Sequence, residues 1–80
     1  MGYHIREIKK GNYGELSKIK EELEEAYDAE EQGQDVMLII ELSDIVGAVE
    51  GVALKYGFTL EQLVTFARLR SAVAKEEQEK

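Results

Sequence analysis

The sequence predicts an all-α fold of three helices, and three observations support this prediction. Proline is absent, so no residue forces a helix to break. Apolar residues recur three and four positions apart along most of the chain. Glycines stand between the periodic segments, where they are typical of helix ends and turns. We therefore expect one domain over residues 1–80, built as a three-helix antiparallel unit with short connections.

The N-terminal third divides into an arm and a helix. Residues 1–14 hold three glycines and are predicted to form an arm, and weak alternation over 4–9 allows a short strand there. A helix is expected over about 15–31 because its apolar residues fall on one face. Gly33 is expected to end this helix.

Two further helices are expected in the remainder of the chain. The second starts at Asp35, a typical N-cap residue, and continues to Tyr56. The third is capped by Thr59, and Gln62 stands three residues later, as in a capping box. Residues 75–80 form a polar tail that is expected to fray.

Length and composition limit the class of protein. A domain of 80 residues buries a small share of its surface, so we expect the helices to complete a four-helix-bundle-like core by oligomerisation, as a homodimer or homotetramer. The absence of cysteine excludes disulfides and thiolate metal sites. A net charge of -7 argues against binding to a nucleic acid polymer. We find no apolar run that would cross a membrane and no signal peptide, which predicts a cytoplasmic protein.

The most informative anomaly is a pair of acids in the apolar helix. Glu41 and Asp44 are three residues apart within the very apolar segment 36–49, so their carboxylates are neighbours on the helix surface. Two adjacent carboxylates repel each other, and burial makes both charges costly. Such a pair is tolerated if it is exposed, if one acid is protonated, or if a cation lies between the two. The small residues Ala48 and Gly51 on this face leave room for a ligand.

The first helix offers a matching pair, Glu22 and Glu25. If the two helices pack antiparallel, these acids face Glu41 and Asp44, and four carboxylates converge. Oxygen ligands of this kind favour Mg²⁺, Mn²⁺ or Ca²⁺. The only histidine, His4, is expected to be a tolerated residue of the arm rather than a catalyst.

Other interpretations of these acids remain open. The first helix is acidic throughout, and an acidic run is usually a solvated face. Glu41 and Asp44 are also consistent with the edge of an interface, where they would reach solvent or pair with Lys55, Arg68 or Arg70.

The spacing of the four acids resembles the signature of a known superfamily. Glu22-x-x-Glu25, fifteen further residues and then Glu41-x-x-Asp44 is similar to the pattern of the all-α nucleotide pyrophosphohydrolases. That superfamily includes MazG-type enzymes, dimeric dUTPases and phosphoribosyl-ATP pyrophosphohydrolase. The sequences around both motifs also look like the family's motif helices, and the chain to about residue 63 resembles short, phage-type MazG-like proteins.

The resemblance implies a concrete activity. Such enzymes hydrolyse a nucleoside triphosphate between its α and β phosphates and release a monophosphate and pyrophosphate, in a house-cleaning or nucleotide-pool role. It implies that Glu22, Glu25, Glu41 and Asp44 bind Mg²⁺, with Mn²⁺ as a substitute. It further implies that Glu21 or Glu22 orients or deprotonates the attacking water, and that the protein is an oligomer.

The third helix departs from the family pattern, because the Lys and Asn that help to hold the nucleotide in many members lack a clean match. Four basic residues are candidate phosphate contacts, with surface charge as the alternative: Lys18, Lys55, Arg68 and Arg70. Tyr27 and Tyr56 are candidates to stack on a base, although core packing is the alternative for both. Two other functions therefore stay open, a non-catalytic oligomeric helical module that binds metal, nucleotide or a partner protein, and phosphoribosyl-ATP pyrophosphohydrolase itself.

Overall fold

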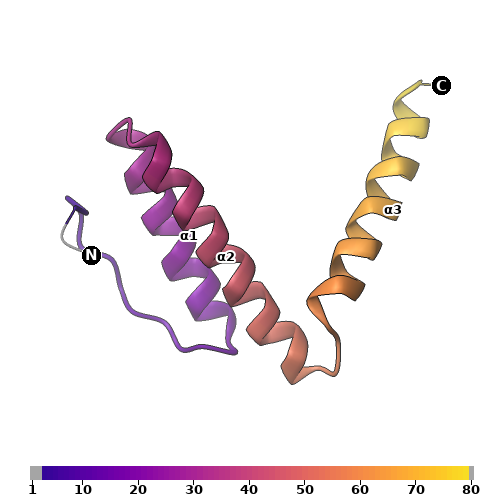
Figure 1. The fold of residues 1–80 in the computed structure, drawn as a ribbon, viewed down its shortest axis with the longest axis horizontal. Helices are drawn as coiled ribbons and strands as arrows, with labels where there is room; N and C mark the ends of the chain where they lie inside the picture. Colours follow the sequence, from indigo (N-terminus) through magenta and orange to yellow (C-terminus); the bar gives the residue numbers. More distant parts are fainter. Residues whose placement is uncertain (1–2, 80) are drawn as a thin grey trace.

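The chain folds into three helices, and the all-α prediction is confirmed. The computed structural model describes the backbone of residues 3–79 and the side chains of residues 3–76. The helices are α1 (Leu16–Glu31), α2 (Asp35–Lys55) and α3 (Leu60–Glu79). No strand forms within residues 3–79, so the short strand considered for 4–9 is absent. That segment is instead an extended arm that runs beside α1 (Figure 1).

The observed helix ends confirm two of the predicted end signals and correct a third. The Gly33 backbone has a φ of 69°, a left-handed conformation that suits glycine and ends α1 as predicted. The capping box of α3 is also confirmed, since the Gln62 N–H donates to Thr59 Oγ1 at 3.1 Å and the Thr59 N–H donates to Gln62 Oε1 at 2.9 Å. The N-cap prediction for α2 was wrong by one residue. Gln34 is the N-cap and makes no side-chain capping bond, while Asp35 places its negative charge in the first turn.

The polar end of the chain is helical, contrary to the prediction of a frayed tail over 75–80. Helix α3 continues through residues 75–79, and residue 80 lies outside the described residues. Lys, Glu and Gln are good helix formers, so intrinsic propensity extends the helix even where no apolar face directs it.

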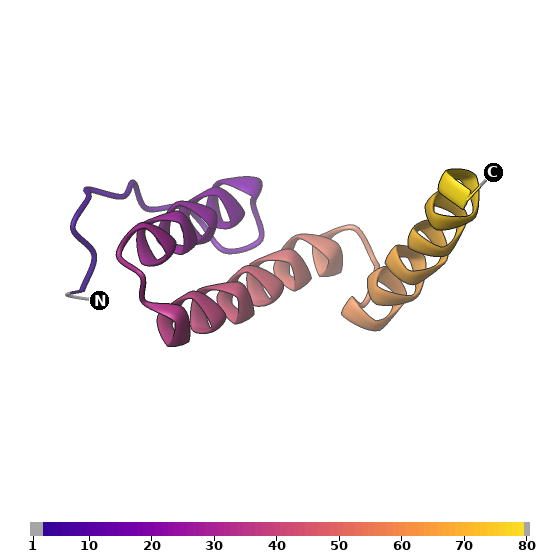
Figure 2. The same ribbon diagram turned by 90° about the horizontal axis from the view of Figure 1, so that it is seen from above.

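Helices α1 and α2 form an antiparallel hairpin, which both views show (Figures 1 and 2). The buried apolar residues of the hairpin are all small, with Ala26 and Ala29 on α1 and Ala48 and Ala53 on α2. Gly51 is also buried, under the ring of Tyr13. Residues this small allow the two helix backbones to lie close together, which brings the side chains at the hairpin's edges within reach of each other.

Helix α3 diverges from this hairpin instead of packing along it. Figure 1 shows α3 leading away from the turn, and of the other two helices α3 contacts α2 but not α1. Phe58 and Phe66 make an edge-to-face contact with ring centres 6.5 Å apart near that turn. Leu69 and Val73, further along α3, are exposed. The expected three-helix antiparallel unit is therefore realised by α1 and α2 alone.

The apolar side of the α1–α2 hairpin also faces outward. Leu23 on α1 and Leu42 and Val46 on α2 are each more than two-fifths exposed, at 44%, 46% and 47%. The face of α2 that packs against α1 is the one with Glu41 and Ala48. No helix within residues 3–79 is both long enough and apolar enough to span a bilayer.

Candidate metal centre

The four acids that the spacing selects converge in the structure. Helix α1 positions Glu22 and Glu25, and helix α2 positions Glu41 and Asp44. One carboxylate oxygen from each of the four lies within 4.8 Å of the others. We call these four residues the acid cluster. The convergence follows from geometry, because residues three apart share a helix face and the antiparallel hairpin turns the two faces toward each other.

Burial makes the acid cluster electrostatically demanding. Glu41 is 2% exposed and Glu22 is 6% exposed, whereas Asp44 is exposed and opens the cluster to solvent. Two full negative charges this close repel each other by on the order of 3 kcal/mol at an effective dielectric constant of about 20. In addition, Glu22 Oε2 is buried without a hydrogen-bond partner in the described part of the chain. An unpaired buried carboxylate oxygen calls for a positive ligand.

A proton on Glu25 neutralises part of the negative charge of the acid cluster. Burial of the Glu25 carboxyl, the hydrogen bond that its protonated form makes with Glu22, and the negative charges of Glu22 and Glu41 raise the pKa of Glu25 to about 7. Glu25 therefore holds its proton to a higher pH than an ordinary glutamate when no metal is bound. A divalent cation would replace this proton with a larger charge.

A groove beside the acid cluster provides space for a larger ligand. Its volume is about 410 Å³, and Tyr13, Lys18, Glu22, Asp44 and Gly47 are among the residues that line it. The groove is shallow and widely open to solvent. The Lys18 ammonium is 3.1 Å from Glu22 Oε1, and this contact together with Glu21 raises the pKa of Lys18. A positive charge thus stands at the edge of the acid cluster.

Glu21, predicted as a candidate for orienting water, lies outside the acid cluster. Its carboxylate accepts a hydrogen bond from the Gly11 N–H at 2.8 Å and pairs with Lys18 at 3.2 Å and Lys10 at 3.6 Å. Burial alone would raise the pKa of Glu21, but these three partners outweigh it and lower the pKa. Glu21 therefore anchors the arm to α1, and Glu22 is the better placed of the two predicted residues.

The remaining predicted contacts are away from the cluster. Lys55 is exposed at the end of α2, and Arg68 and Arg70 lie on the diverging α3. Tyr27 and Tyr56 are 52% and 71% exposed, so neither is a core residue in the single chain. Of the four basic candidates, the structure brings only Lys18 to the acids.

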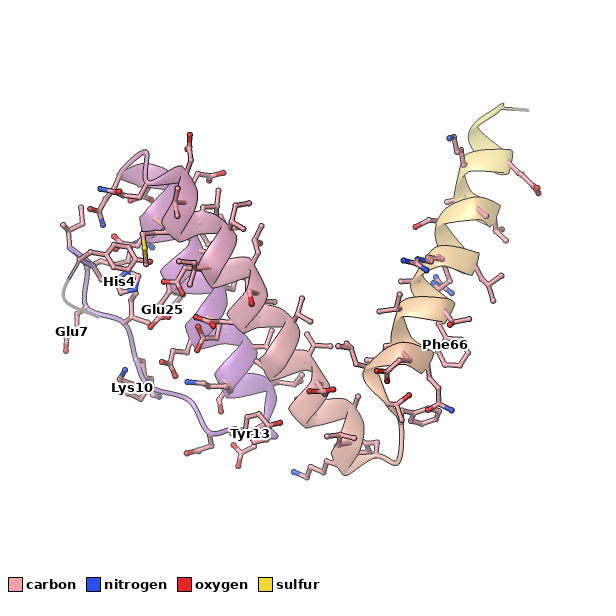
Figure 3. All side chains as sticks on the ribbon, in the orientation of Figure 1. His4, Glu7, Lys10, Tyr13, Glu25 and Phe66 are labelled. Atoms are coloured by element: carbon pink, nitrogen blue, oxygen red, sulfur yellow. The ribbon has the colours of Figure 1, made fainter. Side chains whose placement is uncertain are left out.

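His4 and Tyr3 meet the acid cluster from the arm, and neither was selected from the sequence. The His4 ring is wedged between the arm and α1, beside Glu25 (Figure 3), and its Nε2 atom is 3.1 Å from Glu41 Oε2. The Tyr3 hydroxyl donates a hydrogen bond to the same oxygen. His4 is thus part of the site rather than a tolerated arm residue. His4 is the only histidine in the sequence, but its neighbours in the sequence gave no signal of a site, because the carboxylates that it contacts are more than twenty positions away.

Comparison of the chain with protein-family models, curated proteins and solved structures finds no match. The argument for a metal site therefore depends on the residues that form it. Four carboxylates, one with an unpaired buried oxygen, form a set that a hard divalent cation fits in charge and in ligand type.

Proposed function

We propose that the protein is a Mg²⁺-dependent nucleoside triphosphate pyrophosphohydrolase that releases a nucleoside monophosphate and pyrophosphate. The observation that carries the proposal is the convergence of Glu22, Glu25, Glu41 and Asp44 to within 4.8 Å. The resemblance to the MazG-like all-α pyrophosphohydrolases rests on the same four residues. Mn²⁺ is an alternative ion for the same oxygen ligands.

The division of work among the residues follows from their positions. When bound, the magnesium ion would neutralise phosphate charge and polarise the phosphoryl oxygens. Glu22 pairs with Lys18 through Oε1, while its Oε2 has no partner in the described chain and is free to orient a water molecule or accept its proton. Lys18 lines the groove and would hold a phosphate as a point charge. Solvent-exposed Asp44 leaves the entry side open.

The test is pyrophosphate release from a panel of ribo- and deoxyribonucleoside triphosphates with saturating Mg²⁺. We expect turnover by the wild type and a loss of more than about tenfold in Glu41→Gln, because weakening even the second shell of a metal site costs about 10- to 100-fold. Glu30→Gln, an exposed acid of α1 outside the cluster, is the matched control and should retain activity. Turnover that is absent from the wild type, or unchanged in Glu41→Gln, contradicts the proposal.

We further propose that the functional unit is an oligomer of at least two chains. Exposed apolar residues on the α1–α2 hairpin and on α3 support this, since Leu42, Val46 and Leu69 have no covering partner within the described chain. A second copy would bury these faces and complete a bundle-like core.

A non-catalytic metal- or nucleotide-binding module is the second candidate, and one observation favours it. The arm places Tyr3 and His4 on Glu41, so part of the acid cluster is covered in the single chain. Binding of Mg²⁺ without pyrophosphate release, measured calorimetrically and in the same substrate panel, would select this function.

A further inference from the structure

We propose that His4 is the nitrogen ligand of a second metal position, which it forms with Glu25 and Glu41 and which takes a first-row transition dication. The inference rests on the metal-binding part of the proposed function and not on hydrolysis. The Nε2 atom of His4 and one oxygen each of Glu25 and Glu41 lie within 4.8 Å of one another. These three residues form a group distinct from the acid cluster, with which it shares Glu25 and Glu41.

The side chain of His4 is presented as a ligand. It is 9% exposed, with Nε2 3.1 Å from Glu41 Oε2 and 3.9 Å from Glu25 Oε1. Despite these short distances, Nε2 makes no hydrogen bond of acceptable geometry to any residue described by the structure. A buried imidazole nitrogen that faces two carboxylates without bonding to either is placed to share a cation with them.

Asp28 fixes which nitrogen is available. The His4 Nδ1 atom is 2.7 Å from Asp28 Oδ2, and since a carboxylate accepts, Nδ1 carries the proton of this hydrogen bond. In the neutral ring the lone pair is then on Nε2, the atom that faces Glu25 and Glu41. A carboxylate that orients a ligating histidine through its other nitrogen is a recurrent second shell of metal sites.

Further contacts hold Asp28 and the ring in place. Asp28 also accepts from the Ile5 N–H at 3.2 Å and from Gln32 Nε2 at 3.0 Å, and it is fully buried. The Tyr3 ring packs on the imidazole with centroids 4.0 Å apart, and its hydroxyl donates to Glu41. The histidine is therefore pre-oriented by the arm and by α1 together.

The ligand set determines the class of ion. Mg²⁺ is usually bound through carboxylates, phosphates and water, whereas imidazole suits first-row transition ions. The affinity of a mixed nitrogen and oxygen site rises from Mn²⁺ to Co²⁺ in the usual order. The two metal positions therefore differ in ion selectivity. Glu22 and Asp44 belong only to the acid cluster, which is the oxygen position, and His4 belongs only to the second, mixed nitrogen and oxygen position.

The competing explanation is a metal-free ion pair. A doubly protonated His4 would donate toward Glu41 from Nε2 and would balance the buried charge without any metal. Direct detection of a metal–nitrogen bond separates the two explanations.

The first experiment is electron spin echo envelope modulation of Mn²⁺ bound to the full chain. The chain holds one histidine, so any imidazole coupling identifies His4. We expect a directly coordinated ¹⁴N, replaced by the ¹⁵N pattern when the same protein carries ¹⁵N-histidine, a comparison that needs no substitution. Bound Mn²⁺ that shows no nitrogen coupling at any loading, up to saturation of both positions, overturns the inference and leaves the ion pair.

Three variants then separate this inference from the proposed function. The affinity of each variant is measured in separate titrations with Co²⁺ and with Mg²⁺. His4→Phe, which keeps an aromatic ring against Tyr3, should lose at least tenfold in Co²⁺ affinity and retain Mg²⁺ binding. Asp44→Asn should weaken Mg²⁺ binding and retain the nitrogen coupling. Asp28→Asn, a positioning variant, should lose about 10- to 100-fold in Co²⁺ affinity. Unchanged Co²⁺ affinity in His4→Phe contradicts the second position, whereas a wild type that binds no Mg²⁺ contradicts the proposed function instead.

Discussion

Three acids on α1 show how local partners determine the protonation of a carboxyl group. Glu21 and Asp28 are buried, which alone would raise their pKa values, but partners from the arm, together with Lys18 for Glu21 and Gln32 for Asp28, lower both. Glu25 has carboxylates as its nearest charged neighbours on the helices, and burial with this repulsion raises its pKa to about 7. The arm therefore compensates the acids that hold it in place and leaves the acid cluster short of positive charge.

The raised pKa of Glu25 predicts that the metal-free protein loses stability between about pH 4.5 and 7. Over this interval the unfolded chain releases the Glu25 proton while the folded chain retains it, so folding becomes less favourable as pH rises. The expected loss is on the order of 1–3 kcal/mol, measured by urea unfolding with a chelator present, because solvent screening of a partly exposed carboxyl weakens the full effect of the shift. Glu21 and Asp28 make the opposite contribution to the pH dependence. Their lowered pKa values stabilise the fold, and this stability is lost as pH falls below about 4.5 for Glu21 and below about 3.8 for Asp28.

Glu25→Gln is the control for this prediction, because an amide has about the same shape and no titration. The variant should show a much flatter dependence between pH 4.5 and 7, and should be more stable than the wild type at pH 7. An equal slope in wild type and variant would assign the proton to another group and contradict the assignment.

The candidate site was predictable at the positions where chemistry and helix geometry coincide. Two acids in an apolar helix require a compensating partner, and the three-residue spacing alone places Glu41 beside Asp44 on the helix surface. His4 was not predictable in this way. An arm without regular structure has no period that specifies its register on α1, so its contacts with Asp28 and Glu41 come from tertiary packing.

At the scale of the element, two glycines of α2 differ in the space that a Cβ atom would have. Gly47 has open space where a Cβ would be, so Gly47→Ala should raise the free energy of unfolding by about 0.5–1 kcal/mol through helix propensity. A Cβ on Gly51 would lie 2.6 Å from Tyr13 Cζ, and the ring would have to move. Gly51→Ala should therefore gain less stability or lose it, and should expose the arm to limited proteolysis. Equal gains in the two variants, measured by urea unfolding, would contradict this difference.

The helices themselves were predicted closely because their signals are local. Glycine at a left-handed position and the Thr59–Gln62 capping box depend on a few neighbouring residues, and both appear where expected. The direction of α3 depends on what its apolar face packs against. Because Phe66, Leu69 and Val73 are at least half exposed in the single chain, the sequence specified the helix but not its packing partner.

At the scale of the whole molecule, the described chain resembles part of a larger core. The side of the hairpin that is sealed holds small residues and acids, and the side that is exposed holds Leu23, Leu42 and Val46. A groove of about 190 Å³ lies on that exposed side between α1 and α2, lined by Tyr27 and Leu38 among others. Exposed apolar surface that spans two helices and recurs on the third is typical of an interaction face.

The oligomer proposal predicts a solution mass that is a multiple of the 9.0 kDa chain by size-exclusion chromatography with light scattering. It also predicts a melting temperature that rises with protein concentration, since association stabilises the folded chain by mass action. Leu42→Glu combined with Val46→Glu places two charges on the exposed apolar face and should yield a monomer of lower melting temperature. Gln34→Glu, which adds charge at the exposed start of α2, should keep the mass of the wild type. A wild-type monomer at all concentrations would contradict the proposal, as would a doubly charged variant of unchanged mass.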